Sequence, residues 1–351
     1  MIAARLHGPN RLMVDTVPEA RAPRKGEVLL GVRCVGICGS DLHTFRHARI
    51  GDTAVPAPLI LGHEFSGVVL EAGEGGVDGS GLPLHPGTRV AVDPAQPCGR
   101  CELCLRGDVN LCTALHFCGL FPDDGSLVER MVVPAGTCFP VPAEIDDASA
   151  VLLEPLGVAL HAVDLAHMRP EKSVLIIGAG PIGLMILQAA RQVGGAEKIF
   201  VMEKLPWRLA LAEKLGGLPL RGTGPEGVAD LLARTEGRGV DVVFEAAWAG
   251  DALQDSCDAA KGGARILLAG IPGDDACMAR HSTARRKGLT FLFVRRMKHT
   301  YQRAIELVRS GAVLTGPLVS HRFPLSRAPE AFALNAEYGD GVVKVLIDVA
   351  R

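Results

Sequence analysis

Residues Ser173–Ala190, SVLIIGAGPIGLMILQAA, give the clearest indication of the fold of this chain. It begins with an apolar run of strand type, passes through a glycine-rich turn, and ends in an apolar run long enough for a helix. Glycines in such a turn let the backbone approach a pyrophosphate, which then binds at the positive N-terminus of the helix. We therefore predict a dinucleotide-binding loop with the residues Gly178, Gly180, Ile182 and Gly183.

The segments around this stretch alternate between two kinds of pattern. Apolar strands occur in SVLIIG, KIFVME, VDVVFEA and ARILLAG, and segments of helical period cover Ile182–Val193, Trp207–Leu215 and Gly227–Thr235. This βαβ rhythm is typical of an α/β domain with a doubly wound parallel sheet. We predict such a domain over residues 157–293.

An acidic residue follows the glycine-rich turn at the distance that a dinucleotide site requires. Glu203 ends the second strand, twenty residues after Gly183. A carboxylate there accepts hydrogen bonds from the adenosine ribose hydroxyls and repels a 2′-phosphate, which favours NAD over NADP. The basic residues Lys204 and Arg208 leave NADP as the alternative, because they either pair with a 2′-phosphate or are solvated charges. Arg208 and Ile271, which follows the last strand, are also assigned to the cofactor site.

The regions on either side of this domain have a different sequence pattern. Glycine and proline break residues 1–156 into short alternating runs such as Glu27–Val35, Gly67–Glu71 and Thr88–Val92, which predicts a β-rich domain. After Thr290 come a helix over Thr300–Ser310, loops with prolines, a second short helix and a closing strand in GVVKVLIDVA. We expect residues 294–351 to return to the first domain.

Four cysteines within PCGRCELCLRGDVNLC carry the strongest local signal, at positions Cys98, Cys101, Cys104 and Cys112. Four thiolates saturate a tetrahedral zinc and leave no position for a substrate. The spacing therefore predicts a structural zinc lobe near residues 93–115, against the alternative of four unrelated buried thiols.

A second group of metal-ligand residues is spread over two motifs. Cys38 lies in GICGSDLH, and His63 and Glu64 lie in GHE about twenty residues later. Three such ligands leave the fourth position of a zinc ion open to water or substrate, as a catalytic site requires. The alternative is a histidine in the core and a glutamate that caps an element.

Composition excludes several functional classes. The formal net charge of -2 and the content of two Trp and two Tyr do not suit a nucleic-acid partner. The N-terminus lacks the apolar stretch of a secretory signal, and the longest apolar runs fall short of the ~20 residues that cross a bilayer. We expect a cytoplasmic protein without a membrane partner, whose clustered cysteines bind metal rather than form disulfides.

Taken in order, these motifs resemble those of the zinc-dependent medium-chain dehydrogenases, and within them the polyol branch that acts on sorbitol and xylitol. The resemblance covers nearly the whole chain, through GICGSDLH, HARIG, LGHEFSG, CGRCELCLRGDVNLC, PDDGSL, LLEPLGVALHA, GAGPIG, GGARILLAGIP and PLVSHRFPL. It implies a GroES-like catalytic domain joined to a Rossmann domain, with a catalytic and a structural zinc. It further implies oxidation of a secondary alcohol of a polyol or sugar-derived substrate to a ketone, hydride transfer to NAD, and a homodimer or homotetramer.

The resemblance also assigns the residues of the reaction centre. Cys38, His63 and Glu64 match the ligands of the catalytic zinc. Glu154 in LLEPL matches a carboxylate beside the metal, which binds it directly, through water, or only in some states. The mechanism implied is Lewis-acid catalysis, in which the metal favours the ionised form of the substrate hydroxyl before hydride leaves.

Other residues match positions around the substrate, with two departures. Ser40 and His43 match the positions that pass the alcohol proton toward solvent. Arg296 matches the arginine of an Arg-Tyr pair near the substrate, but Met297 replaces the tyrosine, and Thr44 stands where sorbitol dehydrogenases often have a tyrosine. Two missing phenols leave the identity of the polyol open.

Two further features leave alternatives open. The segment before Thr300 is rich in basic residues, which suit the carboxylate of a sugar acid or the phosphate of a sugar phosphate as an alternative substrate. The plainer interpretation is a cluster of charges that is solvated or contacts another subunit. The basic residues are Arg285, Arg286, Lys287, Arg295, Arg296 and Lys298. Trp248 follows FEAA where the family has a small residue near the cofactor, and it either alters NAD contacts or covers an edge.

The rival functions differ in the chemistry they need. A threonine or simple secondary-alcohol dehydrogenase would use the same zinc and NAD. A non-catalytic dinucleotide sensor or a structural zinc protein would follow if the open zinc site were incomplete, but its residues are all present.

Overall fold

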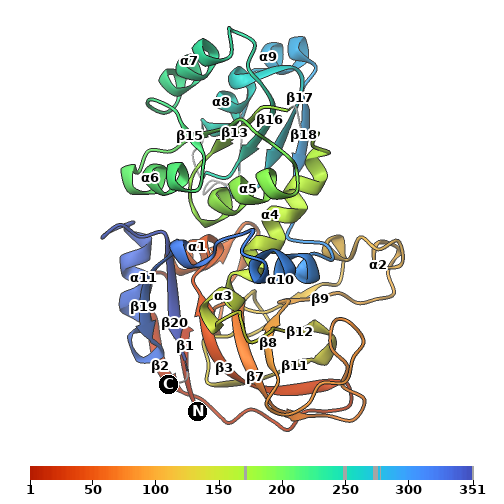
Figure 1. The fold of residues 1–351 in the computed structure, drawn as a ribbon. Coiled ribbons are helices and arrows are strands. Elements are labelled where there is room, and N and C mark those ends of the chain that lie inside the picture. Colours follow the sequence, from red (N-terminus) through yellow and green to blue (C-terminus); the bar gives the residue numbers. More distant parts are fainter. Residues whose placement is uncertain (170–171, 248–250, 272–275, 277, 350–351) are drawn as a thin grey trace. The chain divides into compact units, whose positions relative to one another are not determined.

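The computed structural model describes residues 1–169, 172–247, 251–271, 276 and 278–349. The chain divides into two compact units (Figure 1). The first unit contains Met1–Glu154, Tyr301–Ser310 and Val319–Arg351, and the second contains Pro155–Thr300 and Gly311–Leu318. The domain boundaries expected from the sequence, at residues 156 and 293, stay a prediction.

The first unit is built on a seven-stranded sheet. Six strands follow the order β12-β8-β7-β3-β20-β19, and β11 pairs with β3. The closing strand β20 is antiparallel to β3, so the end of the chain lies beside one of its first strands. The bounds are β3 Glu27–Gly36, β7 Glu64–Ala72, β8 Arg89–Val92, β11 Arg130–Pro134, β12 Cys138–Pro140, β19 Val319–Pro324 and β20 Lys344–Asp348. The predicted β-rich domain is confirmed.

Smaller elements complete this unit. A three-stranded sheet joins β2, β1 and β6, and two ribbons pair β4 with β5 and β9 with β10. Their bounds are β1 Ile2–Leu6, β2 Leu12–Thr16, β4 Arg49–Ile50, β5 Thr53–Ala54, β6 Leu59–Ile60, β9 Ala95–Gln96 and β10 His116–Phe117. The helices are α1 Gly39–His47, α2 Glu102–Leu105, α3 Asp147–Val151, the start of α4 Leu153–Ala166, α10 Tyr301–Arg309 and α11 Ala328–Ala336.

Helix α1 was not predicted, because nine mostly polar residues carry no helical period. A capping box starts it instead: the side chain of Cys38 accepts from the third helical residue, and Asp41 accepts from the backbone N–H of Cys38. The residues that start the helix are therefore also residues of the candidate site.

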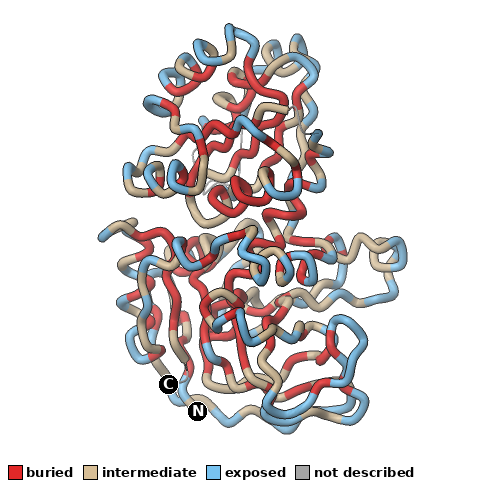
Figure 2. The backbone as a smooth tube through the Cα atoms, viewed as in Figure 1, coloured by how far each residue is buried: buried red, intermediate tan, exposed pale blue. Residues whose placement is uncertain are grey.

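Apolar side chains on the strands and on α11 form the core of the first unit. Leu30, Phe65 and Phe332 are among the largest side chains that are fully buried there. Figure 2 shows buried residues along the strands of each unit. This packing fixes the strand register, because a shift by one residue would turn the apolar face outward.

The second unit contains a six-stranded parallel sheet of the order β15-β14-β13-β16-β17-β18. The strand order reverses beside the central strand β13, which is where doubly wound sheets bind ligands. The strands are β13 Val174–Ile177, β14 Ile199–Met202, β15 Leu218–Pro219, β16 Val240–Glu245, β17 Ala260–Leu268 and β18 Thr290–Phe293. The predicted doubly wound fold is confirmed.

The helices of this unit are α5 Pro181–Gln192, α6 Pro206–Lys214, α7 Pro225–Arg234, α8 Ala252–Ala259 and α9 His281–Lys287. The first three begin one or two residues before the predicted starts. Each has proline as its first residue, where the missing N–H costs no hydrogen bond and the fixed φ suits a helix. Among the described residues, no helix combines the length and the apolar character needed to cross a membrane.

Candidate functional site

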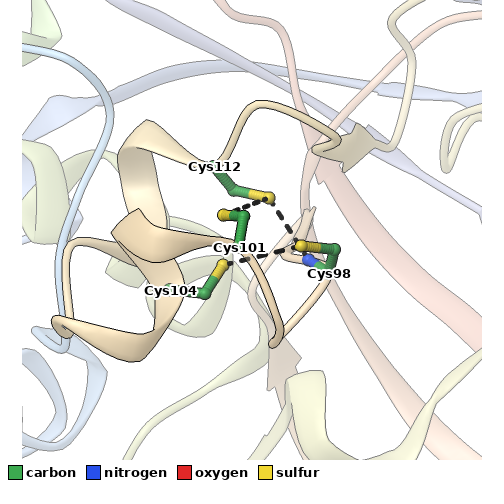
Figure 3. A group of neighbouring side chains, drawn as sticks. All are labelled: Cys98, Cys101, Cys104 and Cys112. Carbon is green, nitrogen blue, oxygen red and sulfur yellow. Dashed lines mark hydrogen bonds between the residues drawn. The ribbon is translucent and has the colours of Figure 1, made fainter.

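The four cysteines of the lobe converge as predicted (Figure 3). Cys101 precedes α2 as its N-cap, and all four sulfur atoms lie within 4.8 Å of one another. The Sγ atoms of Cys98 and Cys104 are 4.0 Å apart, and those of Cys101 and Cys112 are 3.9 Å apart. Zn–S bonds of about 2.3 Å in a tetrahedron place sulfur atoms roughly 3.8 Å apart, so the spacing of this group fits a zinc ion. The four cysteines are free in this structure.

Backbone N–H groups favour the thiolate form in part of this lobe. Hydrogen bonds from Arg100 and Cys101 lower the pKa of Cys98, and one from Cys104 lowers the pKa of Cys101 to about 6. Desolvation and hydrogen bonds with neighbouring thiols raise the pKa of Cys104 to about 12. Lowered pKa values for some thiols and a raised pKa for another are expected where neighbouring thiolates repel each other. A bound divalent cation removes that repulsion.

The second ligand group is assembled by two strands of the first unit. Gly36 at the end of β3 pairs with Glu64 at the start of β7. This register brings Cys38, two residues after Gly36, next to His63 and Glu64. The ligand atoms of these three residues lie within 4.8 Å of one another.

Asp41 orients the histidine of this group. Its Oδ1 lies 3.3 Å from Nδ1 of His63, and the carboxylate also accepts from the backbone N–H groups of Cys38, at 2.9 Å, and Gly62, at 3.3 Å. Because Nδ1 faces Asp41, Nε2 is the nitrogen left to bind a metal. Burial lowers the pKa of His63, but the charges of Asp41 and Cys38 outweigh it and the pKa is raised.

The carboxylate of Glu64 contacts a buried lysine. Oε2 forms an ion pair, without the geometry of a regular hydrogen bond, with Nζ of Lys344 at the start of β20. The side chains are 1% and 2% exposed, respectively. A Cβ atom at Gly36 would collide with Glu64 and lie 2.9 Å from Val151, so only glycine leaves room for this carboxylate.

The donor set of this group fits zinc. A thiolate, an imidazole nitrogen and a carboxylate oxygen are all zinc ligands, and three of them leave one position for water or substrate. A second carboxylate that fixes the histidine, here Asp41, is the usual partner in such sites.

Glu154 is buried in the first turn of α4, outside this group of three. Burial raises its pKa to about 8, against the opposing charge of His63. The carboxylate is therefore close enough to sense the ligand group electrostatically. Its roles as zinc ligand and catalytic residue stay predictions.

Ser40 and His43 both lie on α1, directly after Cys38. His43 is buried, and its Nδ1 is 3.0 Å from the backbone oxygen of Arg49. Since a carbonyl only accepts, Nδ1 is the nitrogen that carries a proton in this contact. Ser40 is half-buried, and its backbone oxygen accepts from the hydroxyl of Thr44 at 3.0 Å.

The glycine-rich turn has the backbone that its sequence predicts. Gly178 directly follows β13 with φ of 95°, and its N–H donates to Met202 at 2.8 Å. A Cβ atom there would lie 2.8 Å from the backbone oxygen of Ala246, and one at Gly183 would collide with Gly178. Gly180 is the N-cap of α5, so the free N–H groups of a 12-residue helix begin at this turn.

Glu203 holds the turn from the neighbouring strand end. Its Oε2 accepts from Ala179 at 2.7 Å, and its Oε1 accepts from Leu205 at 2.9 Å. Carboxylate oxygens accept more than one hydrogen bond, so both remain available to ribose hydroxyls. Arg208 is buried on α6, and its guanidinium faces Gly180. This places a cation beside the glycine-rich turn.

The remaining predicted residues lie in the second unit. Ile182 is half-buried in the first turn of α5, and Ile271 is exposed after β17. Arg296 adopts φ of 56°, an uncommon left-handed conformation for a side chain of this size, and Met297 is buried against Gly157. Trp248 lies outside the described residues.

Asp41 and Lys344 lie at the ligand group, but the sequence pattern assigned neither of them a role. Asp41 stands three positions after Cys38, where a capping box would have drawn attention to it. Lys344 is a charged residue in the otherwise apolar run VVKVLI, and that break in the pattern was its signal.

Known families match both halves of the chain. Residues 24–143 match "Alcohol dehydrogenase GroES-like domain", and residues 181–310 match "Zinc-binding dehydrogenase". Sorbitol dehydrogenase of Bos taurus is 35% identical over 93% of this chain and 90% of its own length. L-idonate 5-dehydrogenase of Vitis vinifera is 32% identical over 92% of this chain and 88% of its own length.

A solved structure agrees with these relatives. An alcohol dehydrogenase from E. coli CFT073, complexed with the cofactor NADH, superimposes with a TM-score of 0.89 at 29% identity and covers 99% of each chain. Sequence and fold therefore point to the same group of proteins.

Proposed function

Because the chain belongs to the polyol dehydrogenase-like branch of the zinc-binding dehydrogenases and is an oxidoreductase acting on CH–OH groups, we propose that it oxidises a secondary alcohol of a polyol or sugar acid to a ketone with NAD. The group of Cys38, His63 and Glu64 carries this proposal, because its three ligands leave a metal position open to substrate. The relatives named for sorbitol and L-idonate support the substrate class.

Cys38, His63 and Glu64 hold the catalytic zinc in this proposal, with Asp41 fixing the ring of His63. When bound, zinc supplies Lewis acidity, which lowers the pKa of a hydroxyl by several units. Glu154 adds a second buried carboxylate near the ligands. Cys98, Cys101, Cys104 and Cys112 hold the structural zinc of the lobe.

The alcohol proton leaves along α1. The hydroxyl of Ser40 accepts it from the substrate, and Nε2 of His43 accepts it next, because Nδ1 is already committed to the backbone oxygen of Arg49. Solvent then takes the proton from His43. The order of the two residues on one helix supports this route.

The nucleotide binds at the turn of Gly178, Gly180, Ile182 and Gly183, where free N–H groups of α5 meet the pyrophosphate. Glu203 accepts from the ribose hydroxyls and repels a 2′-phosphate, which favours NAD over NADP. Arg208 and Ile271 border the same site. Replacing Glu203 with alanine is expected to raise the KM for NAD and narrow the NAD over NADP preference.

Arg296 is proposed to bind the substrate, and its left-handed backbone supports a functional constraint at that position. A guanidinium fork binds carboxylates and phosphates in two-point contacts, so sugar acids and sugar phosphates belong in the substrate test.

A substrate panel tests the proposal. NAD reduction is followed spectrophotometrically with sorbitol, xylitol, cyclitols, aldonates, sugar phosphates, threonine and simple alcohols, using zinc-loaded protein and Cys38→Ser as the control. Turnover of a polyol or sugar acid that vanishes in the control supports the proposal. Turnover of only threonine or simple alcohols contradicts the substrate class, and no turnover despite bound zinc and NAD favours a sensor.

We further propose a homodimer or homotetramer in the cytoplasm. Strand β18 is an edge of the parallel sheet, and Phe293 at its end is 72% exposed, which suits pairing with a second copy. The nine described free cysteines, which include both ligand groups, suit a reducing compartment. Light scattering coupled to size exclusion tests the assembly.

A further inference from the structure

Lys344 occupies a position where a lysine is costly. It lies in β20 among apolar residues, its side chain is 2% exposed, and its Nζ donates to the backbone oxygen of Ile37 at 3.0 Å. An ammonium removed from water destabilises the fold unless charged and polar partners surround it. The partner that Lys344 has here is Glu64, a candidate zinc ligand.

The contact with Lys344 gives the two carboxylate oxygens of Glu64 different surroundings. Oε2 is paired with Lys344, so we take Oε1 as the oxygen that binds a metal. Nζ of Lys344 contacts Oε2 and also donates to the backbone oxygen of Ile37, so its position is fixed from two sides. A fixed cation at Oε2 competes with a second cation for the same oxygen.

A carboxylate with both oxygens free binds a metal through one or both of them. Two-oxygen binding by Glu64 would add a fourth protein ligand atom to the sulfur of Cys38 and the nitrogen of His63. That atom would fill the position that a catalytic zinc needs for its substrate.

We propose that Lys344 is a positioning residue that restricts Glu64 to one metal-binding oxygen and so keeps a coordination position open. This inference rests on the proposed function, in which Cys38, His63 and Glu64 hold the catalytic zinc. Gly36 supports the arrangement, because any larger residue would displace both Glu64 and Lys344.

The first test replaces Lys344 with methionine, or with glutamine if the methionine variant does not fold, in the full-length protein. Cobalt is substituted for zinc, and the difference spectrum against Cys38→Ser isolates the Cys38 site from the four-cysteine lobe. We expect weaker d–d absorption, because the coordination number rises. We also expect metal binding at this site to be about 10-fold tighter in chelator competition, because the metal then replaces Lys344 as the counterion of the buried Glu64 carboxylate. Unchanged absorption and affinity would overturn the proposal, and so would weaker binding.

Three variants make the result specific. Lys344→Arg retains a cation at Oε2 and is expected to restore the wild-type spectrum. Lys261→Met removes another paired lysine, which contacts Asp241 in the second unit, and should leave the spectrum unchanged. In a Glu64→Gln background, Lys344→Met should have no spectral effect, because an amide has only one oxygen with which to bind a metal.

The wild-type protein separates this inference from the proposed function. If wild-type protein shows no cobalt–thiolate absorption that depends on Cys38, both fail. If it shows that absorption and oxidises a polyol or sugar acid, while Lys344→Met leaves spectrum and affinity unchanged, only the role of Lys344 fails.

Discussion

The two zinc-ligand groups are built in opposite ways. The lobe takes its four thiols from Cys98–Cys112, and backbone N–H groups of the same short loop favour the thiolates of Cys98 and Cys101. The other group joins Cys38 at the N-cap of α1, His63 and Glu64 at the start of β7, and the counterion Lys344, which donates to a residue 307 positions away. A local loop suffices for a closed structural site, whereas an open site needs the sheet to hold it.

The largest effect is expected from Cys38→Ser. Loss of a ligand from the open site should lower kcat/KM by at least about 10³-fold, because metal binding shifts the pKa of bound water by roughly nine units. Metal analysis should still find the zinc of the lobe, and circular dichroism should be unchanged. Loss of both metals would show that the two groups are not independent.

Cys104→Ser tests the lobe in the same manner. Structural zinc sites contribute about 10–16 kcal/mol in zinc-finger peptides, so one of four ligands accounts for about 3 kcal/mol, or roughly 100-fold in affinity. Limited proteolysis should then cut near residues 98–112, and cobalt binding at Cys38 should persist. A lobe that stays protease-resistant after chelation would refute a structural role for its metal.

Asp41→Asn tests the residue that orients His63. An outer partner of a metal ligand is worth about 10- to 100-fold in metal affinity or activity, and the zinc affinity of the Cys38 site should fall by that amount. Asp15→Asn is the matched control, since Asp15 also pairs with a histidine, His7, at 2.7 Å but away from the ligand group. Equal losses of zinc affinity in Asp41→Asn and Asp15→Asn would argue for a general effect on the stability of the fold.

The smallest effect is expected from Gly36→Ala. Its methyl group would press on Glu64, Val151 and Lys344, and overpacking of this kind costs of order 1 kcal/mol or somewhat more. Gly31→Ala on the same strand is the control, because its Cβ would meet only Leu70 at an ordinary 3.4 Å. Chemical denaturation with and without zinc measures the free energy of unfolding of both variants. A larger loss of stability in Gly31→Ala than in Gly36→Ala would exclude the crowding explanation.

Sequence patterns could predict most of the fold, because their information is local. The period of the apolar residues identified the strands β13, β14, β16 and β17, and the glycine spacing identified the turn that Gly178 and Gly183 form. The prolines that begin α5, α6 and α7 were a local signal too, and reading them would have corrected the helix starts.

The residues able to bind zinc and a dinucleotide could be identified from the sequence, because ligand chemistry and short spacings are local properties. The contacts of Asp41 with His63 and of Lys344 with one oxygen of Glu64 arise only in the folded chain. These residues meet because β3 pairs antiparallel with both β7 and β20, which brings distant parts of the chain together. The role of a buried charge depends on the residue that pairs with it, and that residue is known only from the fold.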